Sequence, residues 1–310
     1  MTVPMPALKP ARPFFSSGPC AKPPGYSPDK LATECLGRSH RAKIGKSRLA
    51  LCIDLMREVL QLPDLSKVDF ADDVLFTWNG TTSGVRVPDG EWIPDDREGL
   101  TFADATSAVF AYDIPWAKID VATFSWQKVL GGEGGHGVLI LGPRAVQRLE
   151  EYTPSWPLPK VFRLTSKGKL SEGVFKGETI NTPSMLAVED AIFALEWAKD
   201  VGGLGGLQKR CTANADALNK IVADRPWLGH LAVDHGIRSK TSVCLTVEGA
   251  DEAFIKAMAG ALEKEGAAFD IAGYRDAPAG LRIWCGATVD TADIEALGPW
   301  LDWAYASLKN

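Results

Sequence analysis

Positive charge is in short supply in this sequence. It has 34 lysines and arginines against 39 aspartates and glutamates, which gives a net charge of -5, and it has only four histidines. A chain of this kind has no basic field with which to attract a polyanion, so its composition argues against nucleic acid and against an anionic membrane as partners. A small-molecule substrate is favoured by elimination.

Paired cysteines and long apolar stretches are also missing. The six cysteines stand far apart, with no CxxC pair and no neighbouring histidine cluster, so we expect reduced thiols and no metal site. The first 17 residues contain four prolines and no continuous apolar run, so we expect neither a signal peptide nor a membrane span there. The cytoplasm is the default compartment. The cysteines are Cys20, Cys35, Cys52, Cys211, Cys244 and Cys285.

The length of 310 residues, of which 45% are hydrophobic, suits one large and one small domain. Prolines and glycines dominate residues 1–30, which indicates an extended arm. We expect a cofactor-binding large domain over residues 31–205 and a small C-terminal domain over residues 206–310. Residues 46–62 have apolar positions close to helical spacing, and Pro63 ends that pattern.

Four short apolar runs indicate an α/β fold. Each run ends in a small, polar or glycine-rich cluster, as buried strands do where loops at their carboxyl ends bind ligands. The runs are VLFTWNG (74–80), GLTFADATSA (99–108), DVATFSWQK (120–128) and GVLILGP (137–143).

The rest of the chain alternates helical and strand patterns, which predicts a compact α+β domain at the C-terminus. Helices are expected at 183–199, 207–224, 250–266 and 291–308, and strands at 240–249, 267–275 and 280–288. The glycines at 202, 203, 205 and 206 are expected to close the first of these helices, with a domain boundary near them.

The strongest chemical signal is Lys128, which ends a predicted buried strand just before a glycine-rich loop. An amine in such a place can be partly desolvated and lose its proton near neutral pH, as Schiff-base chemistry requires. Taken alone, the same lysine is more often a surface residue in a turn.

Two further strand ends strengthen this signal. Asp104 ends the preceding apolar run, where a carboxylate can keep a pyridinium nitrogen protonated, and Thr81 lies in a hydroxyl-rich turn after the first run. Each has a simpler interpretation, because aspartate favours caps and turns and NGTTSG suits a tight turn. A threonine, an aspartate and a lysine at three successive strand ends are less easily a coincidence.

The motifs NGTTSG, FADATSA and SWQKVLGG, together with FFSSGPCAKPPGY, SHR, FKGETINTPS and GLRIWCGATV, resemble those of phosphoserine aminotransferases, nearly from end to end. The resemblance implies a fold-type-I homodimer with a mixed, mostly parallel sheet and with pyridoxal 5'-phosphate as cofactor. It implies that Lys128 binds the cofactor covalently, that Asp104 pairs with the pyridinium nitrogen, that Thr81 contacts the ring oxygen, and that Gln127 helps to hold the phosphate.

The resemblance also implies shared active sites and a substrate site. Asn181 and Thr182 match residues that family members lend to the partner subunit's cofactor phosphate, although Thr182 before Pro183 also suits a helix cap. His40 and Arg41 match contacts to the substrate phosphate, and Arg282 matches the fork that grips the α-carboxylate. Arg275 and His136 are weaker candidates, as readily structural as functional.

The sequence departs from the family pattern after about Pro63. Only PDLSKVDFADD separates the predicted helix from the first strand, where a fold-type-I large domain has strand and helix units. Two or more such units, at roughly 30 residues each, are missing. With them would go the small-residue loop that cradles the cofactor phosphate and the aromatic that stacks on its ring.

Two hypotheses therefore stand. The first is transamination between glutamate and 3-phosphohydroxypyruvate, which gives O-phospho-L-serine and 2-oxoglutarate, with 4-phosphohydroxythreonine as a related substrate. The second is a catalytically impaired or silent homologue that retains the dimer scaffold. The lysine alone also leaves open another fold-type-I enzyme, such as a cysteine desulfurase or an alanine-glyoxylate aminotransferase, against which SHR and GLRIWCGAT argue.

Overall fold

The computed structural model describes residues 68–179, 182–274 and 277–309. These belong to the unit Val68–Asn310, and the chain divides from its first unit after Lys67. The predicted arm, the helix predicted over residues 46–62, and His40 and Arg41 all lie outside the described residues.

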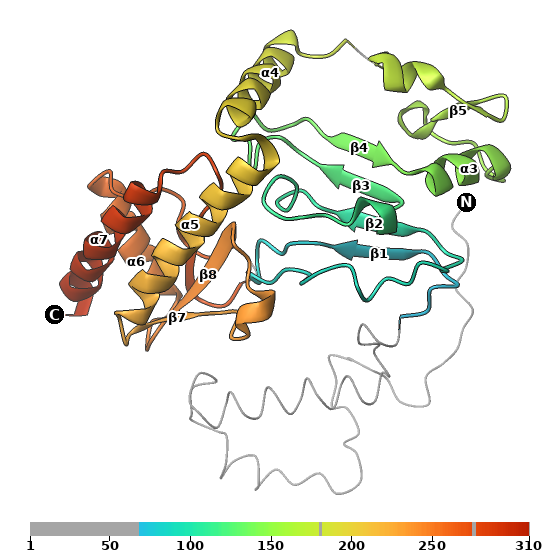
Figure 1. Ribbon diagram of the computed structural model, residues 1–310. Helices are drawn as coiled ribbons and strands as arrows, with labels where there is room; N and C mark the ends of the chain where they lie inside the picture. The colour runs from blue at the N-terminus through green and yellow to red at the C-terminus, as the bar shows by residue number, and fades with distance from the viewer. Residues whose placement is uncertain (1–67, 180–181, 275–276, 310) are drawn as a thin grey trace, which may run out of the picture. The chain divides into compact units, whose positions relative to one another are not determined.

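The N-terminal half of the described chain is built on a four-stranded sheet (Figure 1). Its strands are β1 (Val74–Thr77), β2 (Thr101–Asp104), β3 (Val121–Phe124) and β4 (Val138–Leu141), in the spatial order β1-β2-β3-β4. The pairs β1-β2 and β2-β3 are parallel, and β3-β4 is antiparallel. All four apolar runs therefore form the predicted strands, and the mixed, mostly parallel sheet is confirmed.

The two faces of this sheet differ in cover. By register, one face carries Phe76, Ala103, Ala122 and Ile140. These side chains pack in a hydrophobic core to which the helices at residues 185–200 and 203–223 also contribute. The opposite face is only partly covered by the described residues, since Leu75 is 79% exposed and Leu139 is 49% exposed. Parallel sheets are normally buried on both faces, so the described residues leave part of this face without its usual cover.

Between β4 and the C-terminal domain the chain forms short elements and then two long helices. These are α3 (Pro143–Glu151), the hairpin of β5 (Thr165–Ser166) and β6 (Lys169–Leu170), α4 (Met185–Asp200) and α5 (Gly203–Ala223). The four glycines were expected to lie between the two helices, but only Gly202 lies outside them. Gly202 takes a left-handed conformation after α4, but α5 already begins at Gly203 because Leu207 and Cys211 bury this end of the helix.

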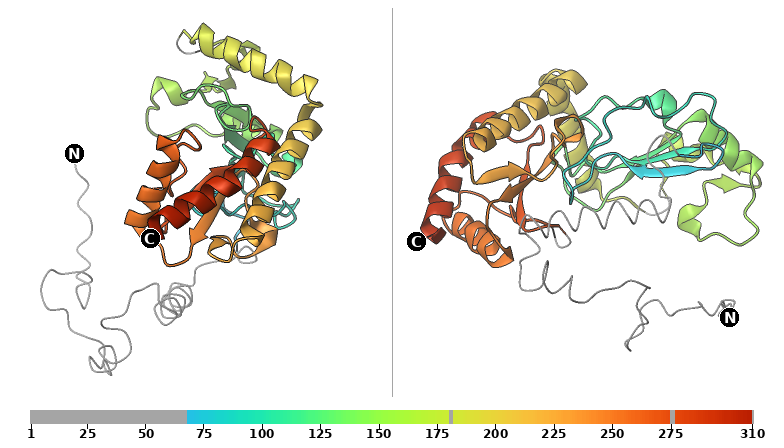
Figure 2. Two further views of the ribbon diagram at one scale, coloured as in Figure 1. Left: turned by 90° about the vertical axis from the view of Figure 1, so that its left-hand side faces the viewer. Right: turned by 90° about the horizontal axis from the view of Figure 1, so that it is seen from below.

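The C-terminal part consists of a three-stranded antiparallel sheet covered by helices on one side (Figure 2). Its elements are β7 (Leu228–His230), β8 (Ser242–Val247), α6 (Glu252–Lys264), β9 (Gly280–Trp284) and α7 (Thr291–Lys309). Leu245, Leu281 and Ile283 pack in a core with Met258 of α6 and Leu301 of α7. Shorter 3-10 turns are Trp116–Lys118, Lys160–Phe162, Glu172–Lys176 and His235–Ile237.

One predicted strand is wrong and one strand was not predicted. Residues 267–274 make only the isolated bridge Ala272↔Leu281, because Asp270 has a φ of 52° and interrupts the extended backbone. The short strand β7 has no clear alternation of its own and forms through pairing with β8.

Helix α5 belongs to both hydrophobic cores. Leu207 and Cys211 pack in the N-terminal core, whereas Leu218, Ile221 and Val222 pack in the C-terminal core. The domain division after residue 205 remains a prediction. None of the described helices is both long and apolar enough to cross a membrane, and the described residues contain no cluster of three or more potential metal ligands.

A buried ion cluster closes the amino end of β2 and β3. The carboxylate of Asp120 accepts from Arg97 at 3.0 Å, from Arg144 at 3.1 Å and from the backbone nitrogen of Thr101 at 2.9 Å. The side chains of Arg97 and Asp120 are 3% and 5% exposed. Their charges are therefore stable only while each has its partners.

Substitution of Asp120→Asn should lower the free energy of unfolding by about 3–5 kcal/mol, because it leaves a buried guanidinium without its counter-ion. The measurement is denaturant unfolding of both proteins. Asp302→Asn, which breaks the more exposed pair with Arg225, is the matched control and should cost less than about 1 kcal/mol. Equal losses in the two variants would contradict the role of burial.

His230 of β7 should make the protein sensitive to acid. Burial, with smaller effects of Arg238 and His235, lowers the pKa of this histidine from 6.5 to about 4. The unfolded chain then binds the proton more readily, so stability falls as the pH drops from about 6.5 towards 4. His230→Gln should lose less thermal stability than the unchanged protein between pH 7 and pH 4.5. Parallel losses would show that this histidine is not responsible.

Candidate active site

The carboxyl ends of three neighbouring parallel strands bring the predicted cofactor residues to one edge of the sheet. Thr77 is in register with Asp104, and Asp104 with Thr123. The turn that carries Thr81 follows β1, Asp104 is the last residue of β2, and the turn that carries Lys128 follows β3. This is the edge at which open α/β sheets bind ligands.

Lys128 and Arg282 line the same pocket, although they are 154 positions apart in the sequence. The pocket has a volume of about 270 Å³, close to the lower end of small-molecule sites. The lysine Nζ lies 5.9 Å from the centre of the Trp284 ring. The lining residues are Gln127, Lys128, Ser242, Phe269, Asp270, Ile271, Arg282 and Trp284.

Strand alternation on β9 explains why Arg282 faces this pocket. Leu281 and Ile283 enter the C-terminal core, so Arg282 and Trp284 lie on the other side of the strand. The guanidinium pairs with Asp270 at 3.0 Å and lies over the ring of Tyr274 at 5.4 Å. Its Nε is buried and has no partner among the described residues.

Thr81 does not line the pocket itself, but it is hydrogen-bonded to Ser242, which does. Its carbonyl oxygen accepts from Ser242 Oγ at 3.3 Å and from Cys244 Sγ at 3.4 Å. Burial raises the pKa of the Cys244 thiol, with Arg282 acting in the opposite direction, so the thiol remains a donor. Gly84 closes the turn with a φ of 67°, where a Cβ would lie 3.0 Å from Cys244.

Asp104 is half-buried and keeps one oxygen free. Its Oδ1 accepts from the backbone nitrogen of Thr106 at 3.0 Å and from the Thr106 hydroxyl at 2.6 Å. Within the described residues Oδ2 accepts no hydrogen bond. The carboxylate therefore makes the turn contact that its residue type favours and still has an acceptor to offer to a ligand.

Alpha helix α4 anchors the glycine-rich loop after Lys128. The backbone nitrogen of Glu133 donates to Asp190 Oδ2 at 2.7 Å, and a Cβ on Gly132 would lie 2.7 Å from the same oxygen. In this loop His136 stacks on Trp126, with ring centres 5.2 Å apart. That contact favours the structural interpretation of His136.

The remaining predicted residues are not brought together. Thr182 is exposed just before α4 and does not line the pocket. Asn181, Arg275, His40 and Arg41 lie outside the described residues.

The residues present fit a phosphorylated cofactor in one testable respect. Ser125 Oγ, three positions before Lys128, is buried and has no hydrogen-bond partner within the described residues. A buried hydroxyl without a partner is costly, and an acceptor-rich ligand would satisfy it.

Sequence reasoning missed five residues of the pocket, which are Ser242, Phe269, Asp270, Ile271 and Trp284. Trp284 was detectable, since it lies two positions after Arg282 on a strand and must share its face. Ser242 and Asp270 carried no comparable signal, because their place depends on the pairing of β8 with β9 and on the chain before β9.

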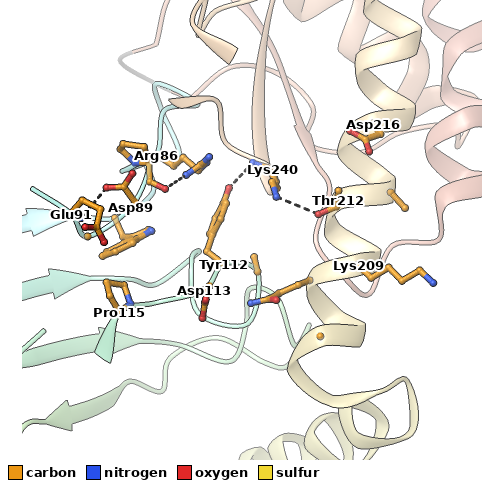
Figure 3. Close-up of a pocket in the computed structure, with 17 residues that line it drawn as sticks. Arg86, Asp89, Glu91, Tyr112, Asp113, Pro115, Lys209, Thr212, Asp216 and Lys240 are labelled. Carbon is orange, nitrogen blue, oxygen red and sulfur yellow. Dashed lines mark hydrogen bonds between the residues drawn. The ribbon is translucent and has the colours of Figure 1, made fainter. Parts of the chain in front are cut away.

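A larger cavity lies elsewhere among the described residues (Figure 3). It has a volume of about 870 Å³, and none of the predicted site residues lines it. Its charges are mixed: Arg86, Lys209 and Lys240 accompany four acidic residues. The Arg86 guanidinium donates hydrogen bonds to the backbone carbonyls of Val87, Pro88 and Gly236. We therefore place the active site at the smaller pocket, where the strand ends converge.

Comparison with known structures shows the same fold. The phosphoserine aminotransferase of Cytophaga hutchinsonii superposes with a TM-score of 0.62 at 22% identity, covering 74% of this chain and 63% of the other. The PLP-bound phosphoserine aminotransferase of Trichomonas vaginalis gives a TM-score of 0.61 at 15% identity, covering 86% and 90%. A comparison with models of protein families finds no match.

Sequence relatives are more specific. The phosphoserine aminotransferase of Methanosarcina barkeri is 48% identical over 369 aligned residues, which cover 98% of this chain and all of the relative. The aligned length exceeds the 310 residues of this chain, so the relative has tens of residues with no counterpart here. On this identity across nearly its whole length, the chain belongs to the phosphoserine aminotransferase family.

Proposed function

We propose that this protein is a pyridoxal-phosphate-dependent transaminase that transfers the amino group of glutamate to 3-phosphohydroxypyruvate, which gives O-phospho-L-serine and 2-oxoglutarate. The observation that carries the proposal is the shared pocket of Lys128 and Arg282. Lys128 supplies an amine, and Arg282 supplies a guanidinium that can bind a carboxylate. An amino acid substrate needs the two groups close enough for one molecule to contact both.

The pocket assigns a task to each of these residues. Arg282 binds the α-carboxylate common to all four reactants, which orients the α-carbon towards Lys128. The lysine amine would accept the proton from that carbon and, with the cofactor bound, would carry it to C4′. Trp284, whose ring lies beside the lysine amine, would help to exclude water from the pocket.

When bound, the cofactor's pyridinium ring supplies an electron sink for the α-carbon. Asp104 would hold the ring nitrogen through its free Oδ2, and Thr81 would contact the ring oxygen. Gln127 and Ser125 would hold the phosphate from this chain, and Asn181 and Thr182 from the partner subunit.

The phosphate of the substrate would be held by His40 and Arg41, as the family resemblance implies. A substrate with the same phosphate and carboxylate groups, such as 4-phosphohydroxythreonine, would use the same contacts. The protein would then serve pyridoxine biosynthesis as well as serine biosynthesis.

Helix α4 supports the proposal of a homodimer. Its buried side consists of Ala187, Ala191, Ala194 and Ala198. Its large apolar side chains are exposed instead, with Leu186 at 76% and Phe193 at 73%. An apolar helix surface of this kind is typical of an interface, and α4 begins three residues after Thr182.

The proposed compartment is the cytoplasm. Cys211, Cys244 and Cys285 are buried free thiols among the described residues, and such thiols suit a reducing environment.

The second candidate is an impaired homologue that keeps the scaffold. The observation that favours it is the greater length of the Methanosarcina relative, together with the partly covered face of the sheet at Leu75. The two candidates differ in whether Lys128 binds the cofactor.

Purified protein with added pyridoxal phosphate should show a visible absorbance band. Borohydride should remove this band and leave the cofactor covalently attached to Lys128. Lys128→Ala should abolish both the band and the labelled peptide. Lys240→Ala, which changes a lysine of the larger pocket, is the matched control and should leave them intact. Label scattered over surface lysines, with no band, would favour the impaired homologue.

Phe193→Glu should convert the proposed dimer to a monomer, because it places a charge in the centre of the apolar surface of α4. The measurement is the molar mass in solution by light scattering at micromolar concentration. Glu196→Gln, at an exposed polar position on the same helix, should leave the mass unchanged. A monomeric unchanged protein would refute the dimer.

A further inference from the structure

The ion pair between Arg282 and Asp270 is unequal in its surroundings. The arginine side chain is 17% exposed, whereas the aspartate side chain is 91% exposed. The two are joined by one hydrogen bond of 3.0 Å from Nη2 to Oδ2. A nearly buried cation is thus neutralised by a carboxylate that is itself almost entirely in water.

The backbone around Asp270 is held, while its side chain is not. The nitrogen of Arg282 donates to the carbonyl of Ile271 at 2.7 Å, which ties this segment to β9. Asp270 has a φ of 52°, a conformation that aspartate and asparagine tolerate better than most residues. Among the described residues its carboxylate has no hydrogen-bond donor besides Arg282, so rotation of the side chain into water breaks only that bond.

The place that Asp270 occupies is the one that a substrate carboxylate needs. Both Asp270 and Arg282 line the pocket of Lys128. Arg282 has no other carboxylate partner in the described part of the chain, and its Nε has no partner of any kind there. Two carboxylates repel one another and compete for the same guanidinium fork.

We propose that Asp270 is a built-in competitor that holds Arg282 in the empty site and is displaced by the α-carboxylate of each substrate. The inference rests on the proposed transamination and adds a residue that sets its affinity. Asp270 acts through Arg282 and touches neither the cofactor nor the reacting atoms. It therefore weakens substrate binding without changing the chemical step.

The competition has a kinetic signature that a purely structural role lacks. In a ping-pong transaminase both substrates place their α-carboxylate on the same arginine. Asp270→Asn keeps the size and the backbone preference of the residue but removes its charge. It should lower the KM of glutamate and the KM of the phosphorylated 2-oxo acid by a similar factor and leave kcat unchanged. An exposed ion pair corresponds to a factor of about 1.5 to 5.

The experiment measures both KM values and kcat, and also the dissociation constant of 2-oxoglutarate by calorimetry, which needs no turnover. Asp302→Asn, which breaks an arginine pair remote from this pocket, is the control and should change none of these constants. Unchanged or raised KM values and dissociation constant in Asp270→Asn would overturn the competitor role, since a mere orienting contact weakens binding when it is lost. If the unchanged protein neither binds 2-oxoglutarate nor transaminates, the proposed function itself is wrong.

Discussion

The candidate site depends on a buried hydrogen-bond network that joins the end of β1 to the beginning of β8. The side-chain nitrogen of Asn79 donates to Ser107 at 2.8 Å and to Thr241 at 3.1 Å, and Tyr112 donates to its oxygen at 3.4 Å. The Tyr112 hydroxyl also accepts from the backbone of Lys240 at 2.5 Å. Burial raises the pKa of this phenol, which keeps the proton that it donates. Each buried group left without a partner would cost about 1–3 kcal/mol, so the two sheets keep one relative position.

This position creates the pocket. Thr241 precedes β8, and the next residue, Ser242, both lines the pocket and donates to Thr81. Lys128 comes from the N-terminal sheet and Arg282 from the C-terminal sheet, so neither makes a site alone. The amine and the guanidinium line one pocket because the network fixes the two sheets that they adjoin.

In the proposed site, the loss of units after Pro63 would affect the cofactor more than the substrate carboxylate. Apart from Gln127 and Lys128, the residues that line the pocket with Arg282 come from β8, β9 and the segment before β9. The family resemblance places the phosphate cradle in the units expected after Pro63, and in this chain we propose Ser125 and Gln127 as phosphate contacts beside Lys128.

Local patterns were sufficient for most elements and for the identity of several site residues. The four strands of the first sheet and the helices α4, α6 and α7 follow from apolar periodicity, because their burial repeats along the chain. The motifs around Thr81, Asp104 and Lys128 identified strand ends with suitable chemistry. Gly203 and the chain from 267 to 274 were misjudged, since burial of Leu207 outweighs glycine propensity and the left-handed backbone at Asp270 leaves no periodic trace.

The sequence by itself determined the family, the order of the elements and the residue types of the site. Only the tertiary structure decided that Lys128 and Arg282 share a pocket and that Ser242 and Trp284 also line it. The ion pair between Asp270 and Arg282 was likewise visible only there. The physical reason is that strand pairing and the buried network around Asn79 act between residues far apart in the chain. Their geometry is a sum of many contacts, none of which is visible in a local pattern of residues.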